Sequence, residues 1–225
     1  YHWVVALFAK WTGLTSLNGF RLIHMVFAAG VIPAFYLLCR ALYPRQAAMR
    51  SLQFMFIPLL FPLFFVTYTD LPALLFTLLM LERTLRRNYL WAAVFALVAV
   101  AMRQTNIVWA GFAGGLIALQ VAREMAVGLR QGPNGGERGV MAPGYVLEVL
   151  ARSRYLLLVL LLFVGFVAWN GGVALGDVEQ HPVSLNLSNV YFCLMVAFVL
   201  FLPFNLGQLG NIGRLLQDRW WLLPV

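Results

Sequence analysis

Residues 19–42 read GFRLIHMVFAAGVIPAFYLLCRAL, and this stretch decides the fold class. Its only permanently charged side chains are Arg21 and Arg40, one near each end, and the residues between them are mostly apolar. A helix needs about 20 mostly apolar residues to cross the hydrocarbon core of a bilayer. The stretch meets this length, so it predicts a transmembrane helix.

The composition extends this prediction to the whole chain. Of its 225 residues, 62% are hydrophobic and 11% are charged, whereas soluble domains are roughly 45–50% apolar and about 25% charged. Lipid can cover this much apolar surface, but it forces every backbone N–H and C=O group to be paired within a helix or a closed barrel. The apolar runs are continuous and do not alternate, which favours helices.

The sequence therefore predicts an all-α, polytopic transmembrane helical bundle. The apolar runs indicate about seven spans, and an N-terminal interfacial helix is expected over residues 1–11, where Trp3, Lys10 and Trp11 suit a membrane surface. The expected spans are Gly19 to Leu42, Ser51 to Val66, Pro72 to Leu81, Tyr89 to Met102, Ile107 to Ala122, Tyr155 to Trp169 and Val190 to Phe204.

The basic residues predict which way the bundle faces. The net charge is +8, and we attribute it to a positive cytosolic face rather than to a nucleic-acid partner. Most arginines fall in alternate connections, while the opposite, far side holds little beyond Lys10, Arg21 and Arg103. The arginines assigned to the cytosolic side are Arg40, Arg45, Arg50, Arg83, Arg86, Arg87, Arg123, Arg130, Arg138, Arg152, Arg154, Arg214 and Arg219.

The chain is expected to form one transmembrane domain over residues 1–225. It begins with Tyr1 rather than Met and ends in an apolar stretch, so we interpret it as a fragment of a longer protein. Residues 131–144 form a Gly- and Pro-rich stretch that predicts a flexible cytosolic linker. Cys39 and Cys193 lie in apolar runs, which indicates buried small side chains and gives no metal-ligand spacing.

Arg103-Gln104-Thr105-Asn106 is the most informative polar string, because it interrupts two apolar helices on the far side. The planar guanidinium of Arg103 suits a phosphate group, to which it can donate two hydrogen bonds. Gln104 and Asn106 can both donate and accept, which suits sugar hydroxyls. The alternative is a polar hairpin turn in which Arg103 extends to the lipid headgroups.

Tyr68-Thr69-Asp70 ends the preceding far-side turn. Asp70 is expected first of all to cap the helix that begins near Pro72. It could instead pair with Arg103 across the far-side surface. An ionisable residue at a membrane edge is also a candidate for a functional role.

The far-side loop over residues 170–189 holds Asp177, Glu179 and His181 close together. A carboxylate there could activate a hydroxyl, and His181 could contact a phosphate. The alternative is an ordinary solvated loop. The spacing matches no recognised metal site, and we expect neither a metal nor a cofactor.

Two strings resemble one enzyme family. PLLFPLFFVTYTDLPALLF at residues 58–76, followed by RQTNIVW at residues 103–109, is similar to the dolichyl-phosphate-glucose α-1,2-glucosyltransferases of the endoplasmic reticulum. A weaker likeness is Gly176-Asp177 followed by His181 and Leu185-Asn186-Leu187. The family adds the terminal glucose to the lipid-linked oligosaccharide used in N-glycosylation.

The resemblance implies a GT-C-like membrane enzyme of the endoplasmic reticulum with a luminal active site. The donor would be dolichyl-phosphate-glucose, the acceptor the diglucosylated oligosaccharide on dolichyl diphosphate, and the reaction an inverting transfer. The implied catalytic residues are Asp70 and Asp177, with Glu179 as a further candidate, and the implied substrate-binding residues are Tyr68, Arg103, Gln104, Asn106 and His181.

Two alternatives stay open at this point. One is another polyprenyl-phosphate-sugar transferase, and the other is a membrane transporter or channel. Transporters often place polar groups and broken helices near the bilayer midplane, in repeated halves, whereas the polar strings here cluster at one membrane edge. In the family the general base is expected in an acidic luminal loop near the N-terminus, which this sequence lacks.

Overall fold

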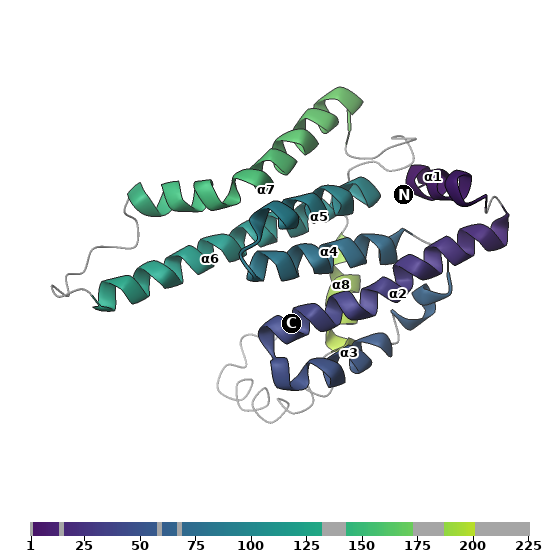
Figure 1. Ribbon diagram of the computed structural model, residues 1–225, viewed down its shortest axis with the longest axis horizontal. Helices are drawn as coiled ribbons and strands as arrows, with labels where there is room; N and C mark the ends of the chain where they lie inside the picture. The colour runs from purple at the N-terminus through teal and green to yellow at the C-terminus, as the bar shows by residue number, and fades with distance from the viewer. Residues whose placement is uncertain are drawn as a thin grey trace, which may run out of the picture. The chain divides into compact units, whose positions relative to one another are not determined.

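The computed structural model describes residues 2–13, 16–57, 60–66, 69–131, 143–172 and 187–200 (Figure 1), and within these ranges every regular element is helical. Residues Tyr1–Leu175 and Gly176–Val225 form two compact units. The second unit contributes α8 (Leu187–Leu200). The first unit contributes α1 (His2–Thr12), α2 (Leu17–Leu42), η1 (Pro44–Gln46), α3 (Ala47–Met55), η2 (Phe61–Phe64), α4 (Asp70–Leu85), α5 (Tyr89–Met102), η3 (Gln104–Asn106), α6 (Ile107–Gln131) and α7 (Pro143–Asn170).

The stretch that decided the fold class forms the long helix α2. The hydroxyl of Ser16 accepts a hydrogen bond of 3.1 Å from the N–H of Gly19, which caps the first turn. The helix continues through Pro33 and ends at Leu42, where the N–H of Tyr43 still reaches the carbonyl of Cys39. The predicted span over residues 19–42 is confirmed as a continuous helix.

Among the described residues, three helical segments are long and apolar enough to cross a membrane. They are Asn18–Leu42, Gln104–Val127 and Gly144–Asn170, and Tyr89–Met102 is a shorter apolar helix. The described residues thus confirm an all-helical chain with helices long and apolar enough to span a membrane, while the seven-span count stays a prediction.

The predicted span over residues 51–66 is wrong as a single helix. Helix α3 ends at Met55, and the next described regular element is the short 3-10 helix η2. The sequence here includes Pro58 and Pro62. Proline lacks the N–H group that continues a helix, and its ring clashes with the preceding turn, so two prolines within five positions prevent one unbroken span.

Two of the other predicted spans are longer in the structure than expected. Helix α6 extends nine residues beyond the expected end at Ala122, and α7 begins well before Tyr155. The predicted linker over residues 131–144 overlaps both neighbouring helices. Gln131 is the last residue of α6, and α7 begins with Pro143 and Gly144. The rest of that linker lies outside the described residues, as does the end of the predicted span at Phe204.

Small side chains allow the helices of the first unit to pack closely. Helix α4 packs against α2, α5 and α6, and α7 packs against α5 and α6. The α2–α4 interface includes Gly30, where a methyl group would lie 3.1 Å from a methyl carbon of Leu75. The larger core joins α4, α5, α6 and α7 and consists of Met80, Ala92, Ala93, Ala96, Ala110, Ala113, Ile117, Val121, Leu156 and Val159.

Large apolar side chains also cover much of the outer surface. On α7, Leu161 is 68% exposed and Val164 is 56% exposed, and on α2, Val26 is 73% exposed. A soluble monomer rarely exposes large contiguous apolar surfaces. Lipid is the environment that these side chains suit, in agreement with the helix lengths.

Ion pairs join α4, α6 and α7 at the end of α4 opposite Asp70. Glu124 on α6 lies 2.6 Å from Arg87 and 2.8 Å from Arg152 of α7, which also lies 2.6 Å from Glu148. Arg87, just after α4, has a φ of 61°. These three chain segments are therefore held together by ion pairs as well as by apolar packing.

Candidate functional site

The polar string identified in the sequence forms the junction between α5 and α6. Helix α5 ends at Met102 because Arg103 adopts extended backbone angles, with φ −151° and ψ 115°. The next three residues form the 3-10 helix η3, and α6 begins directly after it. Arg103 therefore lies at the break between the two helices, with its side chain exposed.

Asp70 lies beside Arg103 and forms an ion pair with it through Oδ1 and Nη1. The side chain of Asp70 is 30% exposed and that of Arg103 is 44% exposed, so the pair is open to a ligand. The contact joins the beginning of α4 to the end of α5, two positions that are 33 residues apart in the sequence.

The expected capping role of Asp70 is wrong. Thr69 occupies the N-cap position of α4 without a side-chain hydrogen bond, and Asp70 is the first residue of the helix. A carboxylate in the first turn still interacts favourably with the helix dipole. Its partner, however, is the guanidinium of Arg103 rather than a backbone N–H of its own helix.

Asn106 stabilises the same junction. Its Nδ2 donates a hydrogen bond of 3.1 Å to the carbonyl of Ala99, in the last turn of α5. The backbone N–H of Arg103 donates to the same oxygen at 3.0 Å. The Ala99 carbonyl thus accepts two hydrogen bonds, and the one from the Asn106 amide ties the polar turn to the last turn of α5.

A cavity of about 270 Å³ lies next to the ion pair. Asp70 and Asn106 contribute its polar groups, together with Thr77, whose hydroxyl already donates to the carbonyl of Ala73. Trp109 on α6 forms part of the wall. The remaining lining residues are Leu60, Leu63, Leu71, Leu74, Leu78 and Leu81.

Thr77 and Trp109 were not among the site residues predicted from the sequence. Trp109 could have been found, because it follows Asn106 by three positions and residues at that spacing lie on one helix face. Thr77 is two turns into α4 from Asp70, and a single Thr inside an apolar run gives no comparable signal.

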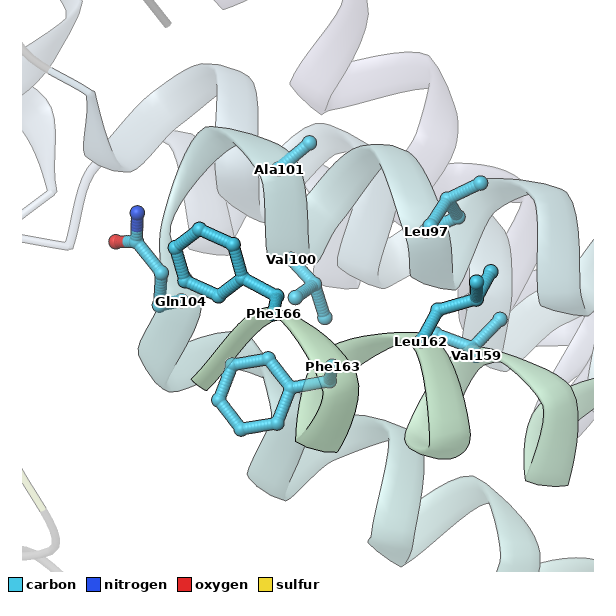
Figure 2. Close-up of a pocket in the computed structure, with 8 residues that line it drawn as sticks. All are labelled: Leu97, Val100, Ala101, Gln104, Val159, Leu162, Phe163 and Phe166. Atoms are coloured by element: carbon cyan, nitrogen blue, oxygen red, sulfur yellow. The ribbon is translucent and has the colours of Figure 1, made fainter. Parts of the chain in front are cut away.

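Gln104 lies at a different cavity. A volume of about 260 Å³ between α5 and α7 is lined by apolar side chains, with Gln104 at one end (Figure 2). Figure 2 shows the ring of Phe166 of α7 beside Val100 of α5, with Phe163 also among the lining residues. The structure therefore brings Asp70, Arg103 and Asn106 together and directs Gln104 to a separate, apolar groove.

The other predicted site residues lie outside the described part of the chain. These are Tyr68, Asp177, Glu179 and His181. Within the described ranges, no group of three His, Cys, Asp or Glu side chains could hold a metal ion. The roles assigned to all of these residues stay predictions.

Comparison with known proteins identifies the family. Residues 1–223 match the DIE2/ALG10 family. This chain belongs to that family. The resemblance inferred from the strings at residues 58–76 and 103–109 is thereby confirmed.

Several curated relatives share a name that describes a glucosyltransferase. A Mus musculus protein named Dol-P-Glc:Glc(2)Man(9)GlcNAc(2)-PP-Dol alpha-1,2-glucosyltransferase is 30% identical over 234 residues, covering 92% of this chain and 49% of that protein. A Homo sapiens protein of the same name is 27% identical and covers 91% of this chain and 48% of its own length. A Mycosarcoma maydis protein of that name is 31% identical over 81% of this chain and 32% of its own length.

The chain thus spans about half the length of the mouse and human relatives that it matches. No solved structure matches it significantly. Family membership is therefore established by sequence, and the described geometry belongs to the part of the family that this chain covers.

Proposed function

We propose that this chain forms part of an inverting glucosyltransferase that moves glucose from dolichyl-phosphate-glucose to the diglucosylated lipid-linked oligosaccharide. The product would have the terminal α-1,2 linkage of the N-glycan precursor. Membership of the DIE2/ALG10 family and the activity in the relatives' names support this proposal.

The observation that supports it most strongly is the Asp70–Arg103 pair beside a cavity with further polar groups. A phosphate-linked sugar needs a cation for the phosphate and hydrogen-bonding groups for the hydroxyls. Arg103 provides a permanent charge with a planar set of donors, and Asn106 provides amide groups within the adjoining cavity.

The chemistry follows from the two linkages. In an inverting reaction, a hydroxyl of the acceptor glucose attacks the anomeric carbon of the donor from the face opposite the phosphate. The new C–O bond forms as the bond to phosphate breaks, and the hydroxyl proton passes to a carboxylate. Dolichyl phosphate leaves with an added negative charge, which a fixed cation stabilises.

Each site residue has a proposed role in this reaction. Arg103 and His181 would bind the donor phosphate, and Asp177 or Glu179 would accept the proton. Asp70 would hold Arg103 in position, in addition to its candidacy as a base. The residues proposed to contact the sugar are Tyr68, Gln104 and Asn106.

The groove between α5 and α7 fits the apolar part of the donor. Its walls are Leu, Val, Ala and Phe side chains, and its one polar residue, Gln104, directly follows Arg103. We assign this groove to the polyprenyl chain, since an isoprenoid offers only apolar surface. The phosphate would then lie at the Gln104 end, close to Arg103.

The proposed setting is the endoplasmic reticulum membrane, with a GT-C-like bundle of about seven spans and the site on the luminal side. Alternating arginine-rich connections support this orientation, because basic residues favour the cytosolic side. The Asp70–Arg103 pair and the ion pairs around Glu124 lie at opposite ends of α4, as this orientation requires.

The test is glucose transfer by the full-length protein with single substitutions. Arg103→Ala should lower kcat/KM for dolichyl-phosphate-glucose by about 100-fold or more, the effect of removing one strong donor from a developing anion. Arg21→Ala is the matched control, because Arg21 is an exposed arginine predicted on the same side. Equal activity of the Arg103 variant and the control would remove Arg103 from the site.

Asp70→Asn separates a charge requirement from packing. Asparagine keeps a hydrogen-bond acceptor for Arg103 but removes the negative charge. If Asp70 acts only by positioning Arg103, Asp70→Asn should lower kcat/KM for the donor in the otherwise unchanged protein but cause little further loss in an Arg103→Ala background. A further large loss of kcat in that background would instead identify Asp70 as the proton acceptor.

A further inference from the structure

A second groove lies between α2 and α3, around the 3-10 helix η1, and shares no lining residue with the cavity beside Asp70. Two adjoining cavities of about 420 and 350 Å³ share Leu42, Tyr43 and Arg50. The first is also lined by Pro44, Arg45 and Gln46, and the second by Phe35, Leu38, Cys39, Gln53, Phe54 and Ile57.

The groove is cationic at one end and apolar at the other. Arg45 and Arg50 lie on η1 and α3, where the chain turns, and both line the first cavity. The second cavity follows α2 back into the membrane-spanning region. Phe35 and Phe54 form part of its wall and stack with ring centroids 3.8 Å apart.

The charges of this groove have no carboxylate partner among the described residues. Asp70 is the first acidic residue in the sequence, so the connection over residues 43–50 holds no acid of its own. The α4–α5 connection is different, since Arg83 and Arg86 contact Glu82 and Arg87 contacts Glu124. Among the described residues, one arginine-rich connection is thus neutralised by glutamates, whereas the other has no acidic partner and suits an external anion.

The guanidinium of Arg50 is held by contacts within the protein and still has N–H groups that make none of these contacts. Its Nε and Nη2 donate to Oε1 of Gln46 at 3.1 and 2.9 Å, and its guanidinium carbon lies 3.9 Å from the centre of the Tyr43 ring. A guanidinium has five N–H donors, so these two bonds leave others for a ligand. A donor group that is already oriented loses less entropy on binding.

We propose that this groove binds an anionic phospholipid from the leaflet at which the α2–α3 connection lies. The phosphate and acidic headgroup would contact Arg45 and Arg50, and an acyl chain would lie along Phe35, Leu38 and Ile57. A free phosphate would use only the cationic end and leave the apolar cavity unfilled. This site is separate from the proposed transferase site and does not depend on it.

Lipid titration of the purified full-length protein, followed by native mass spectrometry, tests the proposal. The probes are phosphatidylserine, phosphatidylcholine with matched acyl chains, and inorganic phosphate as a competitor. Phosphatidylserine should bind about 10- to 30-fold more tightly than phosphatidylcholine, as expected for two arginines near an anionic headgroup. Inorganic phosphate should not displace it at equal concentration.

Arg45→Gln and Arg50→Gln should each remove most of this preference. Arg45 is exposed and has no hydrogen bond or ion pair to the described residues, so its substitution leaves internal contacts intact. Arg154→Gln is the matched control, since Arg154 is also exposed and also stacks on a tyrosine, Tyr155, but lines neither cavity. It should keep the preference.

Three results would overturn the proposal. Equal binding of the two lipids would show that the cations do not select an anion. A preference that survives both groove substitutions would place the lipid elsewhere. Displacement by inorganic phosphate would make this a site for a free anion, without a lipid chain.

Discussion

Arg87 combines an unfavourable left-handed backbone conformation with an ion pair to Glu124. Its φ of 61° is the positive φ of a residue that ends a helix in the left-handed region, a position usually taken by glycine. Among the described residues, it is the one non-glycine residue with such a φ. Its guanidinium lies 2.6 Å from Glu124 of α6, and glycine could not make that contact.

The left-handed backbone of Arg87 predicts that glycine at this position is more stabilising than alanine, the reverse of their usual order in a helix. Arg87→Ala and Arg87→Gly both remove the ion pair with Glu124, but only alanine keeps a β-carbon in the left-handed conformation. The glycine variant should therefore be more stable than the alanine variant by about 1 kcal/mol. Thermal unfolding of both variants in the same detergent measures the difference, and a more stable alanine variant would contradict the left-handed turn.

The sequence predicted only part of the site, because a single polar side chain can make more than one kind of contact. Arg103 and Asn106 stood out because four polar residues in a row interrupt apolar helices. The partner of Asp70 was left open, since a carboxylate near a helix start can cap the helix or pair with a cation. The separation of Gln104 from Asn106 depends on the turn of η3, which the sequence does not specify.

At the scale of helices, the apolar runs predicted where helices form. They did not predict where a helix breaks within an apolar run. Helices α2 and α5 match their predicted ranges, because continuous apolar stretches with polar ends leave little choice. The region around Pro58 and Pro62 is apolar enough for a span, and hydrophobicity alone therefore predicted one. Proline does not continue a helix, and the structure has two separate elements here, α3 and η2.

Buried alanine side chains form a large part of the core shared by α4, α5, α6 and α7. Ala96 and Ala113 are each 0% exposed in the core shared by four helices. In a membrane, helices associate through close van der Waals packing of small residues, because lipid chains are as apolar as the side chains. The alanines of this core therefore act as contact points rather than as unspecific apolar filling.

Enlarging one of these contact points should separate the helices. Ala113→Leu adds three carbon atoms where no space remains and is expected to destabilise the fold by about 1–3 kcal/mol. Val108→Leu on the same helix is the control, because Val108 is 71% exposed and should tolerate the change. Equal thermal stability of the two variants in detergent would contradict the packing described for α6.

At the scale of the whole molecule, the ion pairs of the first unit lie in two groups, one at each end of α4. The Asp70–Arg103 pair joins the beginning of α4 to the end of α5, while Arg87, Glu124 and Arg152 join the other ends. The arginine pattern alone predicted this division of the described first unit. It could not predict which arginines are neutralised by glutamates, because that depends on how the helices pack.

The proposed orientation predicts which residues a membrane-impermeant reagent reaches. In a protein with Cys39→Ala and Cys193→Ala, a maleimide added to sealed microsomes should label Asn134→Cys, in the predicted cytosolic linker. Thr105→Cys, at the Arg103 turn, should be labelled only after the membrane is permeabilised. The opposite pattern would put the candidate site on the cytosolic side and contradict the luminal assignment.

Glucose transfer by the purified full-length protein tests the central proposal most directly. The assay supplies dolichyl-phosphate-glucose and the diglucosylated oligosaccharide on dolichyl diphosphate, and product mass and linkage are measured. We expect one added hexose in α-1,2 linkage, with dolichyl-phosphate-mannose giving no product. Absence of transfer by a correctly inserted protein, or transfer of mannose in place of glucose, would contradict the proposed function.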